Sequence, residues 1–545
     1  MKVDPITGTM NITSEILPHP SEYGLPHESW RKHGYETVEK LLAKHNGSVT
    51  FLSAPTGSGK TSYARALAEK MGATAFVKTK LLQLQYENIY NFDLMFGRAN
   101  YPCVHPDRLD SEASAAECLY ELKMDQCEYS EECPYLLQKN IVQESSVRVL
   151  NYAYLLSAKW PRDKKYATTY AVYDEAHILP DETLEFVGCT IRESDRVRWR
   201  LDGFPSCYDS SHDSLMWCLD WLERSIGVIE TEIATLKSDD ISDKAKKSRG
   251  ERFAGKLKAT AAAVHRSADD WFVRSGLRAL DVQGGKAAGL FLKPLTARYH
   301  FPRLFLGVYP RVVMMSATLG NVSDLAEELG VAGYEYDSVP NQWPADSRPV
   351  HVLDVPSMGM KATESARVEH AEQIAKALKG LPGDWSGVIH TTSWQSAFDL
   401  TKRLVKAGIP NKRLFIPSRG NTKTQLEEWE QAKKKQAGAL VVTPTFNQGV
   451  DLLEERICII AKTPFPYCAP GTYEYEKMMY SNKFYRWTTA SDLEQRCGRT
   501  RRGRDEDYDD SFHVRGYVAI ADGSFKRMGL GKSCSRDFND SLVFD

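Results

Sequence analysis

Residues 52–61 read Leu52-Ser53-Ala54-Pro55-Thr56-Gly57-Ser58-Gly59-Lys60-Thr61. The roles of the other motifs in the sequence depend on the role of this stretch. The apolar and β-branched run at residues 48–52 predicts a buried strand, and residues 62–70 combine helical spacing with good helix formers. A strand, a glycine-bearing loop ending in Gly-Lys-Thr, and a helix are the context of a phosphate-binding P-loop. The glycines let successive N–H groups face one anion, and the helix N-terminus adds partial positive charge. Residues 55–61 are therefore the predicted nucleotide-binding loop, with Ala54 replacing the first glycine of the general pattern.

A second predicted strand ends in two carboxylates that can complete the nucleotide site. Lys60 is expected to reach the β- and γ-phosphates of a nucleotide, and the Thr61 hydroxyl to hold Mg²⁺. Residues 170–174 read as a strand that ends in Asp174 and Glu175. Asp174 can hold the same Mg²⁺ from across the loop, and Glu175 can orient and deprotonate an attacking water. The alternative is an ordinary polar loop, which the upstream P-loop disfavours.

Composition limits the class of protein. The chain has 545 residues, of which 42% are hydrophobic and 26% charged, as expected for a globular protein of several domains. No apolar run approaches the length of a membrane span, and the N-terminus lacks a signal-peptide core. These features predict no membrane association and a cytoplasmic location, or a nuclear one in a eukaryote. A net charge of −2 excludes a globally basic coat protein, but not a local basic groove.

Four of the 11 cysteines lie close together in the sequence. Cys103, Cys118, Cys127 and Cys133 are separated by 14, 8 and 5 residues in a segment without strong periodicity. Such a segment builds little core, so a metal centre would stabilise it. Four thiolates suit zinc or an iron–sulfur cluster, and the absence of a short Cys-x₂₋₄-Cys knuckle favours the cluster. Four unligated cysteines remain the alternative.

Further strands and helices continue the alternating pattern. Residues 73–77 predict a strand followed by Thr79 and Lys80, which suit phosphate contacts or a solvated loop. Residues 190–290 predict a helical insertion, with helices at 215–235 and 259–273 around a mixed-charge run. A buried strand at 311–315 leads into Ser316-Ala317-Thr318. From about residue 345, five strands alternate with helices, which predicts a second, mostly parallel sheet.

The second sheet has no P-loop, but it carries two polar motifs. The first is residues 445–451, with Thr445, Gln448, Gly449 and Asp451. The second is residues 495–502, with Gln495, Arg499 and Arg502. Arg499 and Arg502 share a face if this segment is helical. Guanidinium groups that reach a transferring phosphoryl across a cleft act as arginine fingers, whereas a bare basic helix face is the alternative.

The order of these motifs, with the four cysteines between the first two, resembles the XPD/DinG family of iron–sulfur superfamily 2 DNA helicases. The resemblance implies an α/β fold of two RecA-like parallel-sheet domains, with an iron–sulfur cluster insertion and a helical arch insertion in the first. Residues 1–100, 141–189 and 291–340 then form the first RecA-like domain, and 341–545 the second. Residues 101–140 form the cluster domain and 190–290 the arch.

Roles carried over by position follow from the same resemblance, which implies ATP, Mg²⁺ and a [4Fe–4S] cluster as cofactors. The cluster ligands would be Cys103, Cys118, Cys127 and Cys133. Coupling of hydrolysis to strand movement would fall to His177, Ser316, Ala317 and Thr318. DNA backbone contacts would come from Thr79, Lys80 and Thr445. The residues of the second domain that face the nucleotide would be Gln448, Gly449, Asp451, Gln495, Arg499 and Arg502.

The resulting functional prediction is an ATP-dependent helicase. It would move 5′→3′ on single-stranded DNA and unwind forked or tailed duplexes as a monomer, with cleft closure linked to hydrolysis. RNA-containing hybrids are further candidate substrates. The alternatives are a translocase that removes proteins or RNA from DNA without general unwinding, and a single-strand-binding module with a decayed ATPase. Tyr101, Tyr485 and Trp487 are candidates for base stacking, but core packing is the expected role of each one taken singly.

Overall fold

The structure is a computed structural model, and part of the chain is described in it. The described residues are 17–27, 29–31, 33–55, 58–106, 114–118, 127–207, 209–236, 241–276, 289–340, 349–359, 361–446, 455–498 and 516–544. Several predicted site residues lie outside these ranges, namely Thr56, Gly57, Gln448, Gly449, Asp451, Arg499 and Arg502.

The first domain is built on a seven-stranded parallel sheet with the order β10-β1-β9-β5-β2-β4-β3. Helices cover both faces of this sheet, so its central strands are almost continuously apolar. The strands are β1 (Val49–Ser53), β2 (Ala73–Val77), β3 (Asp93–Met95), β4 (Val147–Asn151), β5 (Tyr170–Asp174), β9 (Arg311–Ser316) and β10 (Glu335–Ser338). The helices are α1 (Gly34–Leu42), α2 (Lys60–Met71), α3 (Lys80–Tyr90), α5 (Tyr152–Ser157), α6 (Leu179–Val187) and α10 (Val322–Leu329).

Two insertions interrupt the first domain. The cysteine-bearing segment lies between β3 and β4 and ends in α4 (Pro134–Glu144). The second insertion lies between α6 and β9 and contains a helical hairpin with a small antiparallel sheet, in the order β6-β8-β7. Its elements are β6 (Cys189–Arg192), α7 (Glu193–Arg198), α8 (His212–Ala234), α9 (Ile241–Arg266), β7 (Trp271–Ser275) and β8 (Gly289–Pro294).

The expectation of a purely helical insertion is therefore wrong in part. The predicted helix at 259–273 ends at Arg266, and Trp271, Phe272 and Val273 belong to a strand instead. These aromatic and β-branched residues are buried on both faces of β7, which favours a strand. The mixed-charge run lies largely in α9, where Lys246 pairs with Glu232 of α8 at 2.7 Å.

The second domain contains another seven-stranded parallel sheet, with the order β13-β14-β12-β15-β16-β11-β17. This confirms the predicted second α/β unit. The strands are β11 (Val350–Val352), β12 (Gly387–His390), β13 (Leu414–Phe415), β14 (Leu440–Thr443), β15 (Ile457–Ile460), β16 (Tyr517–Ile520) and β17 (Leu542–Phe544). The helices are α11 (Glu364–Lys379), α12 (Trp394–Lys406), α13 (Thr422–Lys435), α14 (Tyr473–Tyr480), α15 (Asn482–Cys497), α16 (Ser524–Arg527) and α17 (Arg536–Asp540).

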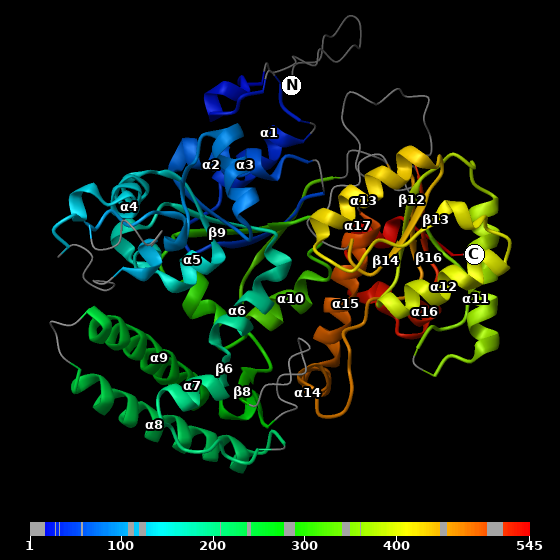
Figure 1. Ribbon diagram of the computed structural model, residues 1–545. Helices are drawn as coiled ribbons and strands as arrows, with labels where there is room; N and C mark the ends of the chain where they lie inside the picture. Colours follow the sequence, from blue (N-terminus) through cyan, green and yellow to red (C-terminus); the bar gives the residue numbers. More distant parts are fainter. Residues whose placement is uncertain are drawn as a thin grey trace, which may run out of the picture.

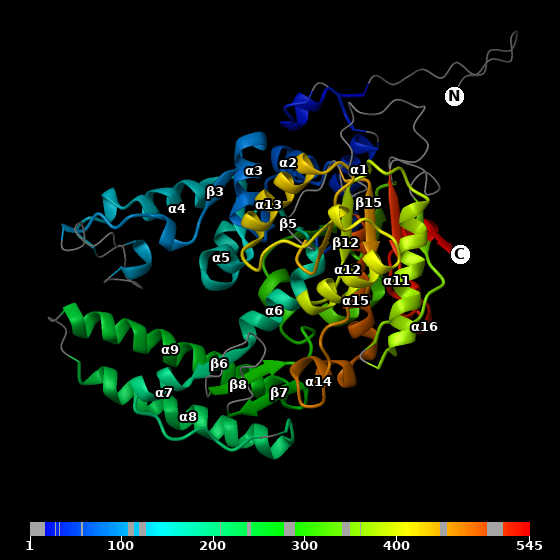
Figure 2. The same ribbon diagram turned by 45° about the vertical axis from the view of Figure 1, so that its right-hand side comes forward.

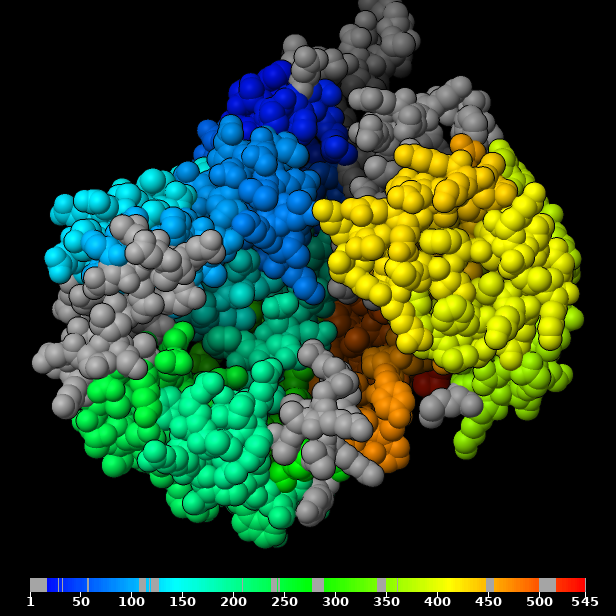
Figure 3. All heavy atoms as spheres, viewed as in Figure 1, coloured from blue at the N-terminus to red at the C-terminus, as the bar shows by residue number. Residues whose placement is uncertain are grey.

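The two domains lie side by side, with α15 on the side of the second sheet that faces the first domain. In both ribbon views α4 and the α8–α9 hairpin project on the same side, away from the second domain (Figures 1 and 2). Figure 3 shows the second domain as a separate lobe, with α14 between that lobe and the insertion. The fold thus places the nucleotide loop, the carboxylates after β5 and the end of α15 near one interdomain boundary.

Candidate functional site

The nucleotide loop leads directly into α2, whose first residue is Lys60. Gly59 caps this helix with φ of 94°, a left-handed conformation that strongly favours glycine. Lys60 Nζ lies 3.4 Å from the carbonyl oxygen of Ala54, which holds the amine back over the loop. Ser58 Oγ is buried and has no hydrogen-bond partner within the described ranges. A buried hydroxyl left in this state beside a helix N-terminus fits a phosphate ligand.

Asp174 is the last residue of β5, and two tyrosine hydroxyls fix its position. The Tyr86 hydroxyl on α3 donates to Asp174 Oδ2 at 3.0 Å, and the Tyr152 hydroxyl donates to the Asp174 carbonyl oxygen at 2.5 Å. Thr61 lowers the pKa of the Tyr86 hydroxyl against the larger effect of burial, so one buried phenol lies beside both predicted Mg²⁺ ligands. Tyr86 was not predicted as a site residue, because it is 88 residues from Asp174 in the sequence.

Burial sets the protonation of this carboxyl group. Burial, with a further contribution from Glu175, raises the pKa of Asp174 to about 6. Lys60 and the Tyr86 hydroxyl act in the opposite direction, since both stabilise the carboxylate. A carboxylate at this position, with the Thr61 hydroxyl close by, suits a hard divalent cation such as Mg²⁺.

Glu175 begins a hydrogen-bonded chain that crosses the domain boundary. It has φ of 56°, an uncommon left-handed conformation for a glutamate. Glu175 Oε2 accepts from Ser316 Oγ at 3.3 Å, and Ser316 Oγ lies 2.9 Å from His177 Nδ1. On the other side of the ring, Gln495 Nε2 contacts His177 Nε2 and donates to Thr318 Oγ1 at 3.3 Å. Burial lowers the pKa of His177, which favours a neutral ring with one donor and one acceptor nitrogen.

The rest of α15 fixes this contact. Trp487 Nε1 donates to the Leu319 carbonyl oxygen at 2.9 Å, and Ser491 Oγ donates to the Thr318 carbonyl oxygen at 3.1 Å. Trp487 and Tyr485 are both buried, so the expected core packing is confirmed for them and they do not serve as stacking surfaces. Residues 316–319, which include Ala317, therefore lie against α15 of the second domain.

The predicted DNA-contacting residues are divided between two surfaces. Thr79 caps α3 and Lys80 is its first residue; both are exposed. Lys80 Nζ donates to Asn100 at 2.8 Å and lies over the Phe96 ring. Thr445 follows β14 in the second domain, where its hydroxyl donates to Gln425 at 2.6 Å.

The four cysteines meet at one small pocket, of about 20 Å³. His105 and Tyr129 share its lining, and their rings make an edge contact at 5.2 Å. Within the described ranges, no three His, Cys, Asp or Glu side chains are arranged to hold a metal ion. The donor set of four thiols around one space still suits a cluster, which is larger than a single ion. The iron–sulfur centre stays a prediction.

No helix in the described part of the chain is long and apolar enough to span a lipid bilayer.

Comparisons with known proteins place this geometry among helicases. The DEAD_2 family model matches residues 98–195, and the helicase C-terminal domain model matches residues 383–540. A probable ATP-dependent helicase of Methanocaldococcus jannaschii is 23% identical over 194 residues, which is 35% of this chain and only 29% of that protein.

Solved structures extend the likeness to the whole fold. A structure of an XPD helicase matches with a TM-score of 0.57 and 14% identity, covering 95% of this chain and all of its own. A structure described as XPD in the apo state matches with a TM-score of 0.52 and 15% identity, covering 94% of this chain and 99% of its own. At this identity the likeness concerns the fold alone, and it confirms the prediction of two RecA-like domains.

Proposed function

Because the chain belongs to the XPD/DinG-like ATP-dependent helicases of superfamily 2, we propose that it moves 5′→3′ along single-stranded DNA and unwinds duplex DNA. The single observation that carries this proposal is the contact of Gln495 with His177 and Thr318. Gln495 belongs to the second domain, whereas His177 is linked through Ser316 to Glu175 in the first. Under this proposal, a change at the γ-phosphate that moves Glu175 would reach the second domain through Ser316, His177 and Gln495.

We propose the following roles for the residues of the site. Lys60 and the loop N–H groups would hold the phosphates, and Thr61 and Asp174 would hold Mg²⁺, which would supply charge neutralisation at the transferring phosphoryl. Glu175 orients the attacking water and accepts its proton. When Glu175 changes its charge or position, Ser316 and His177 change their hydrogen bonds with it. The contact between His177 and Gln495 then changes as well. Arg499 and Arg502 are proposed to complete the site from the second domain.

The cysteine pocket is proposed to hold the [4Fe–4S] cluster in a structural role. Cys103, Cys118, Cys127 and Cys133 would ligate it, and the bound cluster would brace a segment that has little core of its own. Single-stranded DNA and tailed or forked duplexes are the proposed substrates, with Thr79, Lys80 and Thr445 on the phosphate backbone.

Unwinding of tailed duplexes tests the proposal. Protein purified without oxygen is mixed with ATP, Mg²⁺ and a duplex that bears either a 5′ or a 3′ single-stranded tail. We expect opening of the 5′-tailed duplex alone, and its loss in the Lys60→Ala variant, which lacks the phosphate-binding amine.

Each other outcome has a defined meaning. Opening of the 3′-tailed duplex alone would contradict the proposed direction. ATP hydrolysis stimulated by single strands, without unwinding of either duplex, would favour the translocase that strips proteins or RNA from DNA. Absence of ATP turnover would contradict the enzyme itself and favour the single-strand-binding module.

A further inference from the structure

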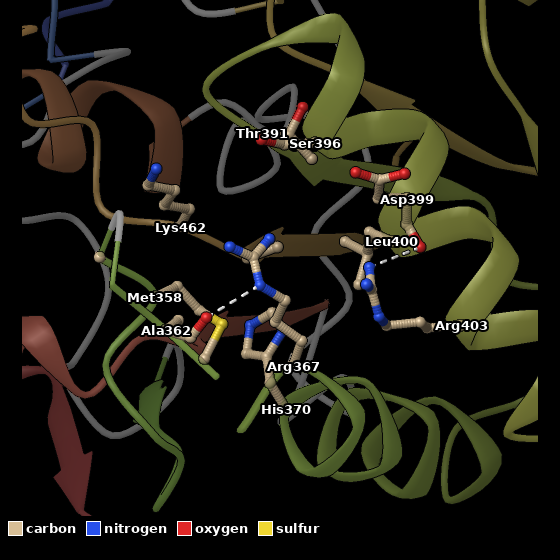
Figure 4. A pocket seen from close by; sticks show the side chains of 12 residues that line it. Met358, Ala362, Arg367, His370, Thr391, Ser396, Asp399, Leu400, Arg403 and Lys462 are labelled. Atoms are coloured by element: carbon tan, nitrogen blue, oxygen red, sulfur yellow. Dashed lines mark hydrogen bonds between the residues drawn. The ribbon is translucent and has the colours of Figure 1, made fainter. Parts of the chain in front are cut away.

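A pocket of about 310 Å³ opens in the second domain, between α11 and α12 (Figure 4). It lies beyond the carboxyl ends of β12 and β15, where parallel sheets commonly bind ligands. None of the residues assigned above to nucleotide, Mg²⁺, cluster or DNA lines it. The volume is that of a small-ligand site.

Two cations that line this space, Arg367 and Lys462, have no ion-pair partner among the described residues. Arg367 comes from α11, and its Nε donates to the Ala362 carbonyl oxygen at 3.2 Å while its guanidinium group points into the pocket (Figure 4). Lys462 comes from the loop after β15 and also lines the pocket (Figure 4). Neither side chain makes an ion pair with any residue that the structure describes, whereas Arg403, which also lines the pocket, is paired with Glu364 at 2.8 Å. The positive charge of Arg367 and Lys462 favours an anion.

The remaining wall carries hydrogen-bonding groups of another kind. Thr391, Ser396 and Asp399 line the side formed by β12 and α12 (Figure 4). Asp399 Oδ1 accepts from Gln395 at 3.0 Å. A carboxylate here repels a second phosphate and accepts hydrogen bonds from hydroxyl or amine groups. The two walls together suit a ligand with one phosphate at one end and donor groups at the other.

Buried contacts hold the pocket in shape. Asp522 is 2% exposed and accepts the backbone N–H groups of Met358 at 2.9 Å and Thr463 at 2.8 Å. It therefore joins the loop after β11 to the loop that bears Lys462. The His370 ring lies 2.7 Å from the carbonyl oxygen of Ala521, which fixes α11 to the same floor. A pocket built in advance loses little entropy when it binds.

We propose that this pocket binds a nucleoside monophosphate unit. Arg367 and Lys462 contact the phosphate, while Asp399 and Ser396 accept from the sugar or base. This chemistry has two sources, a nucleotide of a bound single strand or a free nucleotide. With the strand as source the inference rests on the proposed function, because the pocket then grips the strand on the second domain.

Binding measurements on matched variants test the pocket. Arg367→Ala and Lys462→Ala each remove one phosphate contact, and Lys402→Ala removes an exposed lysine of α12 that does not line the pocket. The probes are a fluorescent oligo-dT of about 15 nucleotides, followed by anisotropy, and dTMP, followed by calorimetry. We expect each pocket variant to bind about tenfold more weakly, while Lys402→Ala binds as the unchanged protein does. For oligo-dT, the slope of log K against log salt should fall by about 0.7.

Thermal unfolding of each variant verifies that it is folded, and Lys462→Gln serves as a milder second change. Weaker oligo-dT binding in the pocket variants supports the strand as source, and loss of dTMP binding alone supports a free nucleotide. Unchanged binding of both probes would overturn the inference. If the unchanged protein neither binds oligo-dT nor turns over ATP, the proposed function fails, and the dTMP measurement still decides the pocket.

Discussion

Tyr86 shows how a single buried side chain prepares the Mg²⁺ site. Its hydroxyl donates to Asp174 and lies beside Thr61, and it favours the ionised form of the aspartate. Tyr86→Phe should therefore raise the Mg²⁺ concentration needed for half-maximal ATP hydrolysis about tenfold, since a hydrogen bond to a charged group is lost. The control is Tyr90→Phe on the same helix, whose hydroxyl bonds His27 and Ser62 instead. An equal Mg²⁺ requirement in both variants would contradict this role.

Asp174 should give the site a dependence on pH. Its folded pKa is about 6, so the protonated form grows as pH falls through that value and competes with Mg²⁺. Apparent Mg²⁺ affinity should be constant above about pH 7 and fall up to tenfold per pH unit below about pH 6. Titration of ATP hydrolysis with Mg²⁺ at several pH values measures this. A requirement that does not change with pH would show that another group controls the metal.

At the scale of elements, α10 carries a buried acid that opposes folding at high pH. Glu328 accepts from the Ala297 N–H group at 3.0 Å and from the Thr296 hydroxyl at 3.2 Å, and burial raises its pKa to about 7. A carboxyl group whose folded pKa lies above its unfolded value favours the folded state at low pH, and that contribution is lost as pH rises from about 4.5 to 7.

Glu328→Gln removes the buried charge while it keeps an oxygen for Ala297. The variant should exceed the unchanged protein in free energy of unfolding by about 1–3 kcal/mol at about pH 8. The difference should shrink at about pH 5, where the unchanged side chain is protonated. Urea unfolding at both pH values measures this. A difference of the same size at both would point to packing instead of charge.

The elements that were predicted differ from the element that was missed in what determines their structure. The parallel strands were predictable because burial on both faces makes runs such as Tyr170–Tyr173 apolar throughout. β7 was missed because its short apolar run cannot be told from the end of a helix until β8 and α8 pack against it. The role of Trp487 could not be decided from its residue type, because an aromatic side chain suits both base stacking and core packing, and its burial shows core packing.

The candidate site shows the same division. The ends of β1 and β5 could be predicted from local motifs, since each motif carries its own strand and loop signal. Tyr86 and Arg367 could not, because their roles come from residues distant in sequence that the fold brings together. The order of residues in the chain does not indicate which side chains will line the same cavity.

At the scale of the whole molecule, α14 joins the second domain to the insertion of the first. Tyr473 packs its ring against Phe272 and Phe291, with centroids 5.7 and 6.2 Å away, and donates to the Pro294 carbonyl oxygen at 2.7 Å. Lys293 lies over the same ring at 4.6 Å. This contact is separate from the one between α15 and residues 316–319. Movement of the second domain during ATP turnover should therefore carry the antiparallel sheet and the α8–α9 hairpin with it.

Tyr473→Ala should break this second connection, because it removes a buried aromatic ring that is worth about 3–5 kcal/mol in a packed core. Hydrogen exchange should then speed up in β7, β8 and α14, while β1 and β5 keep their protection. Tyr473→Phe is the matched control, since it keeps the ring and loses only the bond to Pro294, and it should give a smaller effect. If the hairpin is driven by α14, the alanine variant should also hydrolyse ATP yet unwind tailed duplex more slowly. Unchanged exchange in β7 and β8 would mean that the insertion is held by the first domain alone, and slow unwinding would then need another cause.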